Sequence, residues 1–478
     1  MKKIVYKITV LALIVGAFAS CEEELDQVPF DSFATEQAFV TTADFENAVR
    51  GIYAGLTSGG FYGGSDGGGM LDAPDVLSDN VIFAQKGRGT RRTLHNWQYG
   101  APDGPMYGLY TAAYRTIYRA NILLENSEGF QGNNKANVVA EAKALRALAH
   151  FDMVTFFGKI PTQSSDANGS LGIAYVSVAD PYAEPARETV GAVYEKIVQD
   201  LTDAAAGINA TNDPGRMNRD AVNTLLSRVY LYMGEWQKAV DAANLVTKPV
   251  APRSDVVGVW EDTNQSGLLF YIPNAPPVLG ISVGVTWSQG GLTNLIPEYV
   301  VSYDFYNSFA SDDIRKQAYT MQAANNADGL QFNAIKKLYG RPGQNNGQVD
   351  IKILRAAEAY LNKAEALYNL GQEGPALAAL DVVRTKRYLS PPSGETGTAL
   401  RDAIRLERRF EFAFEYQRFF DLKRWGLSVE RDGFGDLADG TGTPSDAQSL
   451  SAGSIKYQMP IAQSSMDVNP NLVQNPGY

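Results

Sequence analysis

A helix–glycine–helix pattern occurs twice in the chain and limits the folds that the chain can adopt. Residues 225–246, LLSRVYLYMGEWQKAVDAANLV, place Gly234 at a turn and Ala239 five residues later. Residues 361–384, LNKAEALYNLGQEGPALAALDVVR, have the same layout with Gly371 and Ala376. The glycine ends the first helix, and the small residue lets the second helix approach closely. A pair of this kind cannot bury its apolar face alone, so we expect it to stack on neighbouring helices.

The spacing of each pair resembles that of a tetratricopeptide repeat, but the two glycines are 137 residues apart. Two further helices are expected over 137–157 and 192–208, where apolar residues recur every three or four positions before Gly158 and Gly207. Residues 58–105 and 248–349 are rich in glycine and proline and are predicted to be mainly loop, with a short strand at 281–287, ISVGVTW. The expected fold class is therefore mainly α, with tetratricopeptide-type helix pairs, long loop insertions and little β structure.

The N-terminus has the features of a signal peptide. Lys2, Lys3 and Lys7 precede an apolar stretch, Ile8–Ser20, that ends in small residues. Cys21, the only cysteine of the 478 residues, follows directly. Its position resembles that of the acylated cysteine of a bacterial lipoprotein, so we predict a signal peptide over 1–20, lipid attachment at Cys21 and an acidic tether over 21–30.

Composition argues against several classes of function. The formal net charge of −11 argues against a nucleic-acid-binding protein, which needs a basic surface. One cysteine and two histidines, His95 and His150, are too few for an ordinary zinc site. A calcium site made of carboxylates alone stays open. No cofactor is expected, and no GxSxG motif is present to support nucleophilic hydrolysis.

A stretch rich in arginine, glutamate and phenylalanine covers residues 406–426. Glu407, Glu411 and Glu415 are four residues apart, as on one face of a helix. Catalytic carboxylates of glycosidases face each other across a cleft, whereas these are expected to form a charge network with the arginines around them. Those arginines are Arg405, Arg408, Arg409 and Arg418. The aromatic residues of the stretch are predicted to be core: Phe410, Phe412, Phe414, Tyr416, Phe419 and Phe420.

The tryptophans suggest a ligand site by elimination. Trp236 and Trp425 belong to helical segments and are predicted to be structural. Trp97, Trp260 and Trp287 fall in the two loop regions, where an indole face could stack on a sugar ring or simply anchor a loop.

We predict that loops 58–105 and 248–303 converge on one exposed face and carry a shallow ligand site. Residues 86–97, KGRGTRRTLHNW, form a basic island that could donate hydrogen bonds to a ligand or be a solvated surface. The candidate ligand-binding residues are Trp97, His95, Asn96, Arg92, Tyr99, Trp287 and Trp260.

Several motifs together resemble the SusD/RagB family of Bacteroidota surface lipoproteins. LDQVP (25–29) and FVTTADFENAVRGIYAGL (39–56) are similar to the opening of the family. YRTIYRANILLENS (114–127), AEAKALRALAHFDMVTFFGKIP (140–161) and ILRAAEAYLNKAEALYNLG (353–371) match later helices. LERRFEFAFEYQRFFDLKRWG (406–426) and the closing MPIAQSSMDVNPNLVQNPGY (459–478) are the most specific.

The resemblance implies a single SusD-like domain over 31–478, with four helix pairs. It divides into a helical part over 31–247, a loop-rich insert over 248–349 and a helical part over 350–478. The resemblance also implies a lipid-anchored protein of the outer membrane, exposed at the cell surface. Such a protein is not an enzyme: it captures oligosaccharides and passes them to a SusC-type TonB-dependent transporter. A peptide-binding member, an interaction scaffold without a ligand and an enzyme are the alternatives.

Overall fold

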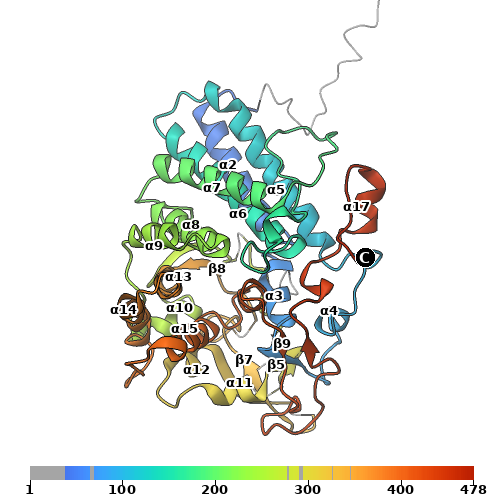
Figure 1. Ribbon diagram of the computed structural model, residues 1–478, viewed down its shortest axis with the longest axis vertical. Helices are drawn as coiled ribbons and strands as arrows, with labels where there is room; N and C mark the ends of the chain where they lie inside the picture. The colour runs from blue at the N-terminus through green and yellow to red at the C-terminus, as the bar shows by residue number, and fades with distance from the viewer. Residues whose placement is uncertain (1–37, 65–68, 277–278, 290–293, 326, 345) are drawn as a thin grey trace, which may run out of the picture.

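The computed structural model describes residues 38–64, 69–276, 279–289, 294–325, 327–344 and 346–478, so Cys21, the segment 1–20 and the tether 21–30 lie outside the described residues. Helices make up most of the ordered structure, which confirms the mainly α fold class (Figure 1). They are α2 (Thr42–Leu56), α3 (Gly69–Val76), α4 (Arg92–His95), α5 (Tyr107–Asn126), α6 (Lys135–Phe157), α7 (Val190–Gly207), α8 (Arg219–Met233), α9 (Trp236–Asn244), α10 (Val256–Trp260), α11 (Tyr303–Ser308), α12 (Ile314–Tyr319), α13 (Ala356–Asn369), α14 (Glu373–Arg384), α15 (Gly397–Glu411), α16 (Arg418–Arg424) and α17 (Gln463–Val468).

The strands form two-stranded antiparallel pairs in the part of the chain that the structure describes. The pairs are β1 (Val81–Phe83) with β5 (Tyr299–Val301), β2 (Leu268–Ile272) with β8 (Ile351–Arg355), β3 (Ser288–Gln289) with β4 (Ile296–Pro297), β6 (Thr320–Ala324) with β7 (Gln331–Ile335), and β9 (Val429–Glu430) with β10 (Ser449–Leu450).

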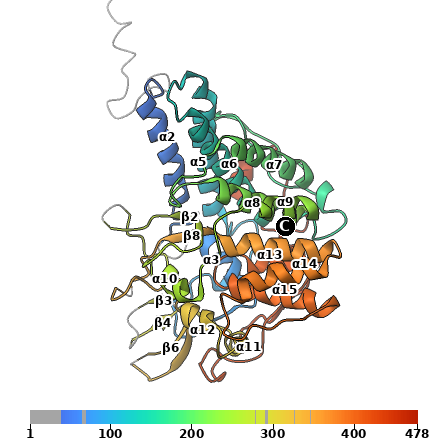
Figure 2. The same ribbon diagram turned by 90° about the vertical axis from the view of Figure 1, so that its left-hand side faces the viewer.

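The two predicted helix–glycine–helix pairs are confirmed as α8–α9 and α13–α14. Gly234 (φ 75°) and Gly371 (φ 74°) take the left-handed backbone conformation that the turns require. Ala239 and Ala376 are fully buried where the helices meet. Helix α13 packs on both α8 and α9, so the two pairs form one stack although an insert separates them in sequence (Figure 2).

The helices predicted over 137–157 and 192–208 are confirmed as α6 and α7. Gly158 directly follows α6, and Thr189 caps α7 by accepting a hydrogen bond from the Ala192 amide. Helices α2, α5, α6 and α7 pack side by side at the N-terminal end of the molecule (Figure 1). This layer carries the groove described below.

The prediction that 58–105 is a loop region is wrong in part, because it contains α3, β1 and α4. Burial of the apolar residues of α3, such as Met70 and Leu71, explains how this helix forms beside glycine-rich sequence. The strand predicted at 281–287 is also wrong: Gly284 lies in a turn so close to Leu338 that an added Cβ would clash with its carbonyl oxygen. The prediction that 248–349 is mainly loop is also wrong in part, because this insert contains α10, α11, α12 and the strands β2 to β7.

The arginine-rich stretch is not one helix. Helix α15 ends at Glu411 and α16 begins at Arg418, so Glu415 does not share a helix with Glu407 and Glu411. Between them, Phe414 (φ 61°) and Tyr416 (φ 57°) adopt the left-handed backbone conformation, which residues other than glycine rarely adopt. Their amides donate to the buried carboxylate of Asp75, at 3.2 and 3.1 Å. A side chain of α3 thus compensates for the strained turn.

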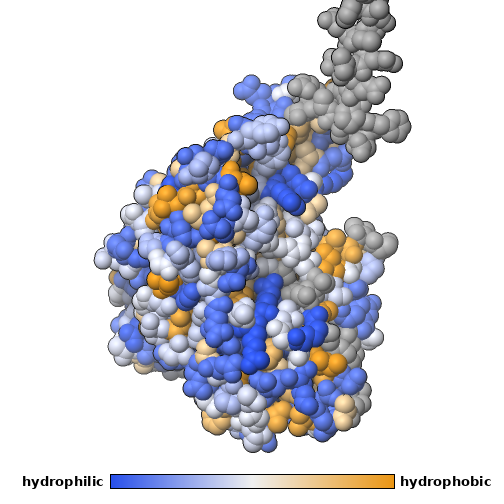
Figure 3. All heavy atoms as spheres, turned by 90° about the vertical axis from the view of Figure 1, so that its right-hand side faces the viewer, coloured by the Kyte–Doolittle hydropathy of each residue, from blue (hydrophilic) through white to orange (hydrophobic). Residues whose placement is uncertain are grey.

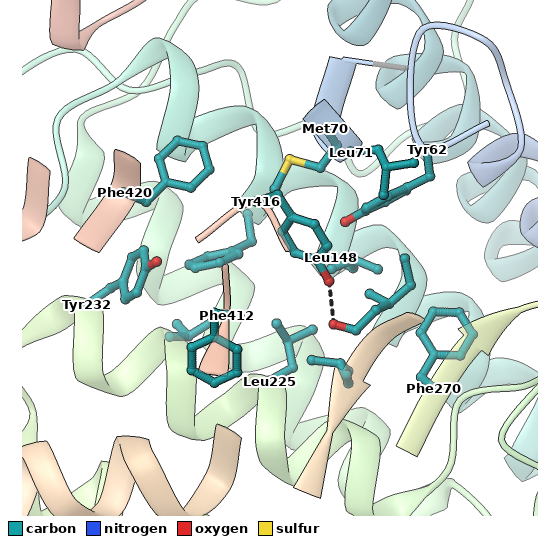
Figure 4. Packing of buried hydrophobic residues seen from close by; sticks show 14 of the residues in the cluster. Tyr62, Met70, Leu71, Leu148, Leu225, Tyr232, Phe270, Phe412, Tyr416 and Phe420 are labelled. Carbon is teal, nitrogen blue, oxygen red and sulfur yellow. Dashed lines mark hydrogen bonds between the residues drawn. The ribbon is translucent and has the colours of Figure 1, made fainter. Parts of the chain in front are cut away.

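The aromatic residues of this stretch are buried as predicted. Figure 4 shows Phe412, Tyr416 and Phe420 packed among side chains of other helices and of β2. The hydroxyl of Tyr416 donates a hydrogen bond to the carbonyl of Ile353 in β8. The turn between α15 and α16 therefore sits at the centre of the molecule.

A buried charge network surrounds this turn. Glu411 is fully buried and accepts hydrogen bonds from Arg355 (2.7 Å) and Arg387 (2.8 Å), with Arg315 at 3.3 Å. These arginines hold the pKa of Glu411 well below its usual value, even though burial alone would raise it. A charge network is present as predicted, but the predicted pairing is wrong. Among the described residues the three glutamates pair with Arg315, Arg355, Arg384, Arg387 and Lys337 instead, and Arg405 forms no ion pair. Arg408 pairs with Asp421, and Arg409 and Arg418 pair with Asp79.

Replacing Glu411 with alanine should destabilise the fold, because it leaves several buried guanidinium groups without their carboxylate. We expect a loss of about 3–5 kcal/mol in the free energy of unfolding, measured by urea denaturation. Asp402→Ala is the control, because the Asp402 pair with Arg401 is exposed and should contribute less than about 1 kcal/mol. Equal losses in the two variants would contradict the central role of Glu411.

Candidate functional site

The two loop regions predicted to carry the ligand site do meet in the structure. Strand β1 pairs with β5, with Val81 opposite Val301. The Tyr299 hydroxyl also donates to the carbonyl of Thr90 at 2.8 Å. The two regions therefore converge as predicted, but they do so at a buried strand pair and not on an exposed face.

The prediction that three tryptophans form an exposed arc is wrong. The exposed fractions of Trp97, Trp260 and Trp287 are 6%, 4% and 1%. The Trp97 indole donates to the Leu77 carbonyl and lies against the Arg431 guanidinium. Trp260 packs against buried cations, Trp287 against other rings. These indoles anchor loops in the core, the alternative that the sequence left open.

The remaining predicted residues are bound within the protein. His95 is buried and bonds the Val76 carbonyl (2.9 Å) and the Ser445 hydroxyl (3.2 Å). Tyr99 is buried and donates to the Lys456 carbonyl. Arg92 and Asn96 both bond the Asp446 carboxylate, at 2.7 and 3.2 Å. Ligand contact by Arg92 and Asn96, which reach the surface, stays a prediction.

The basic island at 86–97 is held by carboxylates from distant parts of the chain. Its ion pairs are Lys86–Asp328, Arg88–Glu298, Arg91–Asp72 and Arg92–Asp446, at 2.7 to 3.0 Å. The island therefore fastens one loop to the insert and to the C-terminal part, which accounts for its charge without a ligand.

A groove with a volume of about 750 Å³ lies elsewhere, between α5, the segment 174–185 and α17. Its size is in the range of small-ligand sites. Tyr107, Tyr110, Tyr114 and Tyr118 line it from α5, where their spacing of three and four residues places them along one helix face. We call this set the tyrosine ladder. At a rise of 1.5 Å per residue, it extends for about 16 Å.

Hydrogen bonds fix the segment 174–185, which forms one wall, against the helices. The Tyr114 hydroxyl donates to Ala174 O at 2.9 Å, and the Asn121 amide donates to Val176 O and Val178 O at 3.1 and 3.2 Å. His150 of α6 accepts from the Val176 amide at 3.0 Å. The groove therefore does not need a ligand to define this wall.

The other wall is α17 with the residues after it. Asn469 donates to Pro185 O at 3.1 Å, and Asn471 donates to Glu184 O at 2.8 Å, which ties the two walls together. Exposed apolar side chains mark the rim, with exposed fractions of 60% for Val178 and 74% for Val468. Figure 3 looks onto the side that carries α17, where apolar patches interrupt a hydrophilic surface.

The groove lining combines ring faces with a few polar groups. Tyr110 and Tyr114 are in edge-to-face contact at 4.8 Å between ring centroids, and burial raises the pKa of both phenols. Arg115, Arg119 and Asp180 supply charge. Arg119 donates to the Gly51 carbonyl, whereas Arg115 forms no ion pair or hydrogen bond with the residues that the structure describes. Such a surface suits the binding of a ligand with flat apolar faces and hydroxyl or carboxylate groups.

The tyrosine ladder has a signal in the sequence, but none of the ligand-binding residues predicted above belongs to it. In YGLYTAAYRTIY, 107–118, tyrosine recurs with helical spacing. The walls have no local signal, because they come from segments about 60 and 350 residues further along the chain.

The described residues contain no group of three or more His, Cys, Asp or Glu side chains placed to hold a metal ion. None of their helices has both the length and the apolar character needed to cross a bilayer.

Comparison with known proteins places this helical fold among SusD-like proteins. The model of the SusD family matches residues 322–478, and a model described as "Starch-binding associating with outer membrane" matches residues 31–231. The two matches lie at opposite ends of the chain and do not overlap. The chain belongs to the SusD/RagB family.

Full-length relatives agree with this assignment. SusD-like protein P2 of Formosa agariphila is 27% identical, and the alignment covers 100% of both chains. A SusD superfamily protein of Bacteroides thetaiotaomicron has a solved structure with a TM-score of 0.81 and 28% identity, over 91% of this chain and 100% of that one. A SusD superfamily protein of Bacteroides vulgatus gives 0.79 and 26%, over 92% and 100%.

His150, which supports the groove wall, should make the free energy of unfolding depend on pH. Its Nδ1 donates to Arg146 O, and its Nε2 accepts from Val176, so the folded protein holds it neutral. Burial lowers its pKa to about 3. Between about pH 6.5 and pH 3 the unfolded chain therefore binds a proton that the folded chain does not, and stability falls as pH falls.

We expect His150→Gln to reduce this dependence. Relative to the variant, the wild type should lose up to about 1.4 kcal/mol per pH unit between pH 6 and 4, measured by urea unfolding. The difference should vanish above about pH 7.5, which serves as the internal control. Equal pH slopes for the two proteins would show that His150 is not held neutral.

Proposed function

We propose that this protein captures oligosaccharides at the cell surface and delivers them to a SusC-type TonB-dependent transporter of the outer membrane. The tyrosine ladder in its walled groove carries the proposal for ligand capture. Tyrosine offers a large, rigid contact surface at low conformational entropy cost, and its hydroxyl can bond sugar hydroxyls. Membership of the SusD/RagB family and the family model described as starch-binding and outer-membrane-associated support the choice of ligand and location.

The groove replaces the tryptophan loops as the proposed ligand site. Its rings are accessible, with 45% of Tyr107 exposed, whereas the three loop tryptophans are almost fully buried. The groove is partly open to solvent, which suits a protein that must release what it captures. Affinity should therefore be modest, in the micromolar to millimolar range, or about −8 to −4 kcal/mol.

A peptide ligand is the second candidate. The valines and prolines of the groove walls would also accept apolar side chains. Binding of peptides from a casein digest, with no binding of oligosaccharides, would favour this candidate. Binding of neither ligand class, with retention of the transporter, would favour an interaction scaffold, and turnover of an oligosaccharide would show an enzyme.

Removing Tyr118 should weaken oligosaccharide binding. We expect Tyr118→Ala to lose about 1–3 kcal/mol of binding free energy, the loss measured when one stacking ring is removed beneath a nucleic-acid base. The measurement is calorimetry with the tightest ligand from a panel of oligosaccharides that includes maltoheptaose. Tyr306→Ala is the matched control, because this half-buried tyrosine lies on α11, outside the groove. Full affinity in a folded Tyr118→Ala protein would remove the ladder from the site.

Cys21 is the proposed lipid attachment site, with 1–20 removed on export. Each buried methylene of an acyl chain adds about 0.8 kcal/mol of membrane affinity, so loss of the acyl chains should release the protein. Cys21→Ala should therefore appear in the soluble fraction, or stay unprocessed, when cells lacking the transporter are fractionated. A variant that partitions with outer membranes as the wild type does would exclude this anchor.

A further inference from the structure

A second pocket lies in the helix stack, away from the tyrosine groove. It has a volume of about 220 Å³ and lies between α9, α13, α15 and α16, the first three of which are stacked in Figure 2. Trp236 and Trp425, which the sequence predicted to be structural, both line it and are only half-buried. The other lining residues are Thr162, Glu365, Tyr368, Asn369, Arg401, Ile404, Arg405 and Arg424.

Arg405 is the cation of this pocket that lacks a carboxylate. It is half-buried, and its guanidinium lies 4.8 Å from the ring centroid of Trp425. Unlike Arg424, which bonds Glu365 through two nitrogens at 2.5 and 2.7 Å, Arg405 forms no ion pair or hydrogen bond with the described part of the chain. A guanidinium held in this way, with its donors unused, can bind a carboxylate through two parallel hydrogen bonds.

The carboxylates near Arg405 are already engaged. Glu365 accepts from Arg424 and from the Trp425 indole at 2.7 Å, and Asp421 pairs with Arg408 and Arg424. Asp402, the third carboxylate nearby, pairs with Arg401. Burial lowers the pKa of Arg405, and the charges of Arg401 and Arg424 lower it further, although Glu365 and Asp402 oppose them. The positive charge of Arg405 is therefore not compensated by an ion pair, although the protein has a net charge of −11.

Thr162 also lines the pocket, but its hydroxyl is enclosed by the protein and is not accessible from the pocket. A free cation and two indoles are therefore the groups that this small cavity offers to a ligand.

We propose that this pocket binds a small carboxylate with a ring-shaped body, of the chemical class of the uronic acids. The carboxylate pairs with Arg405, and the apolar face of the ring lies against Trp236. The volume admits one such unit and not a chain, so this site is separate from the groove and does not rest on the function proposed for it.

The test uses glucuronate as the probe and glucose as its neutral counterpart, at matched ionic strength. Binding to the mature protein is followed by tryptophan fluorescence and by calorimetry. We expect saturable binding of glucuronate, at least about tenfold tighter than that of glucose. Arg405→Gln should lose about tenfold or more in affinity, with an unchanged melting temperature. Because Arg405 forms no ion pair or hydrogen bond with the described residues, its replacement should leave the protein folded.

Two groove variants, Arg115→Gln and Tyr118→Ala, are the controls and should bind glucuronate as the wild type does. Their behaviour separates this site from the proposed oligosaccharide groove, since either can fail without the other. Absence of saturable glucuronate binding, equal binding of glucose, or full affinity in Arg405→Gln would overturn the proposal.

Discussion

The buried carboxylate of Glu411 is the interaction on which the rest of the structure depends. It joins Arg355 at the start of α13, Arg387 after α14 and Arg315 in α12, so one side chain links the stacked helix pairs to the insert between them. Buried charges are costly unless fully paired, and here the geometry supplies several partners at once. Immediately after Glu411, the strained turn bonded to Asp75 brings α3 against the same centre. The N-terminal helical layer, the helix stack and the insert therefore meet around the turn between α15 and α16. The groove and the second pocket lie further out, at the surface.

Local patterns predicted the parts of the fold that local physics decides. The helix–glycine–helix pairs follow from one left-handed glycine and one small residue each, and both are present in the sequence. The break between α15 and α16 could not be predicted in this way, because helical periodicity continues through Phe414 and Tyr416. Their amides are bonded by Asp75, which is more than 330 residues away. Likewise α3 forms beside glycine-rich sequence because its apolar side chains are buried by distant elements.

The ligand site was harder to predict from local sequence patterns than the fold was. Tryptophan in a loop can stack on a ligand or anchor the loop, and only the surroundings decide, as with Trp97 against Arg431 and Trp260 against buried cations. The basic island looked like a ligand surface because the sequence does not reveal its partners Asp328, Glu298, Asp72 and Asp446. The tyrosine ladder was readable from its spacing, but a ladder becomes a groove only when the segment 174–185 and α17 close over it. Binding sites of this kind are assembled from several segments, so one stretch of sequence identifies at most one surface of them.

We propose that the oligosaccharide binds along the tyrosine ladder. The alternative surface is formed by the two loop regions, 58–105 and 248–303, that meet where β1 pairs with β5. A crystal structure of the mature protein with its tightest-binding oligosaccharide tests this claim most directly. We expect sugar rings along Tyr107, Tyr110, Tyr114 and Tyr118, between the segment 174–185 and α17. Sugar bound instead beside the basic island at 86–97, with the groove empty, would contradict the claim.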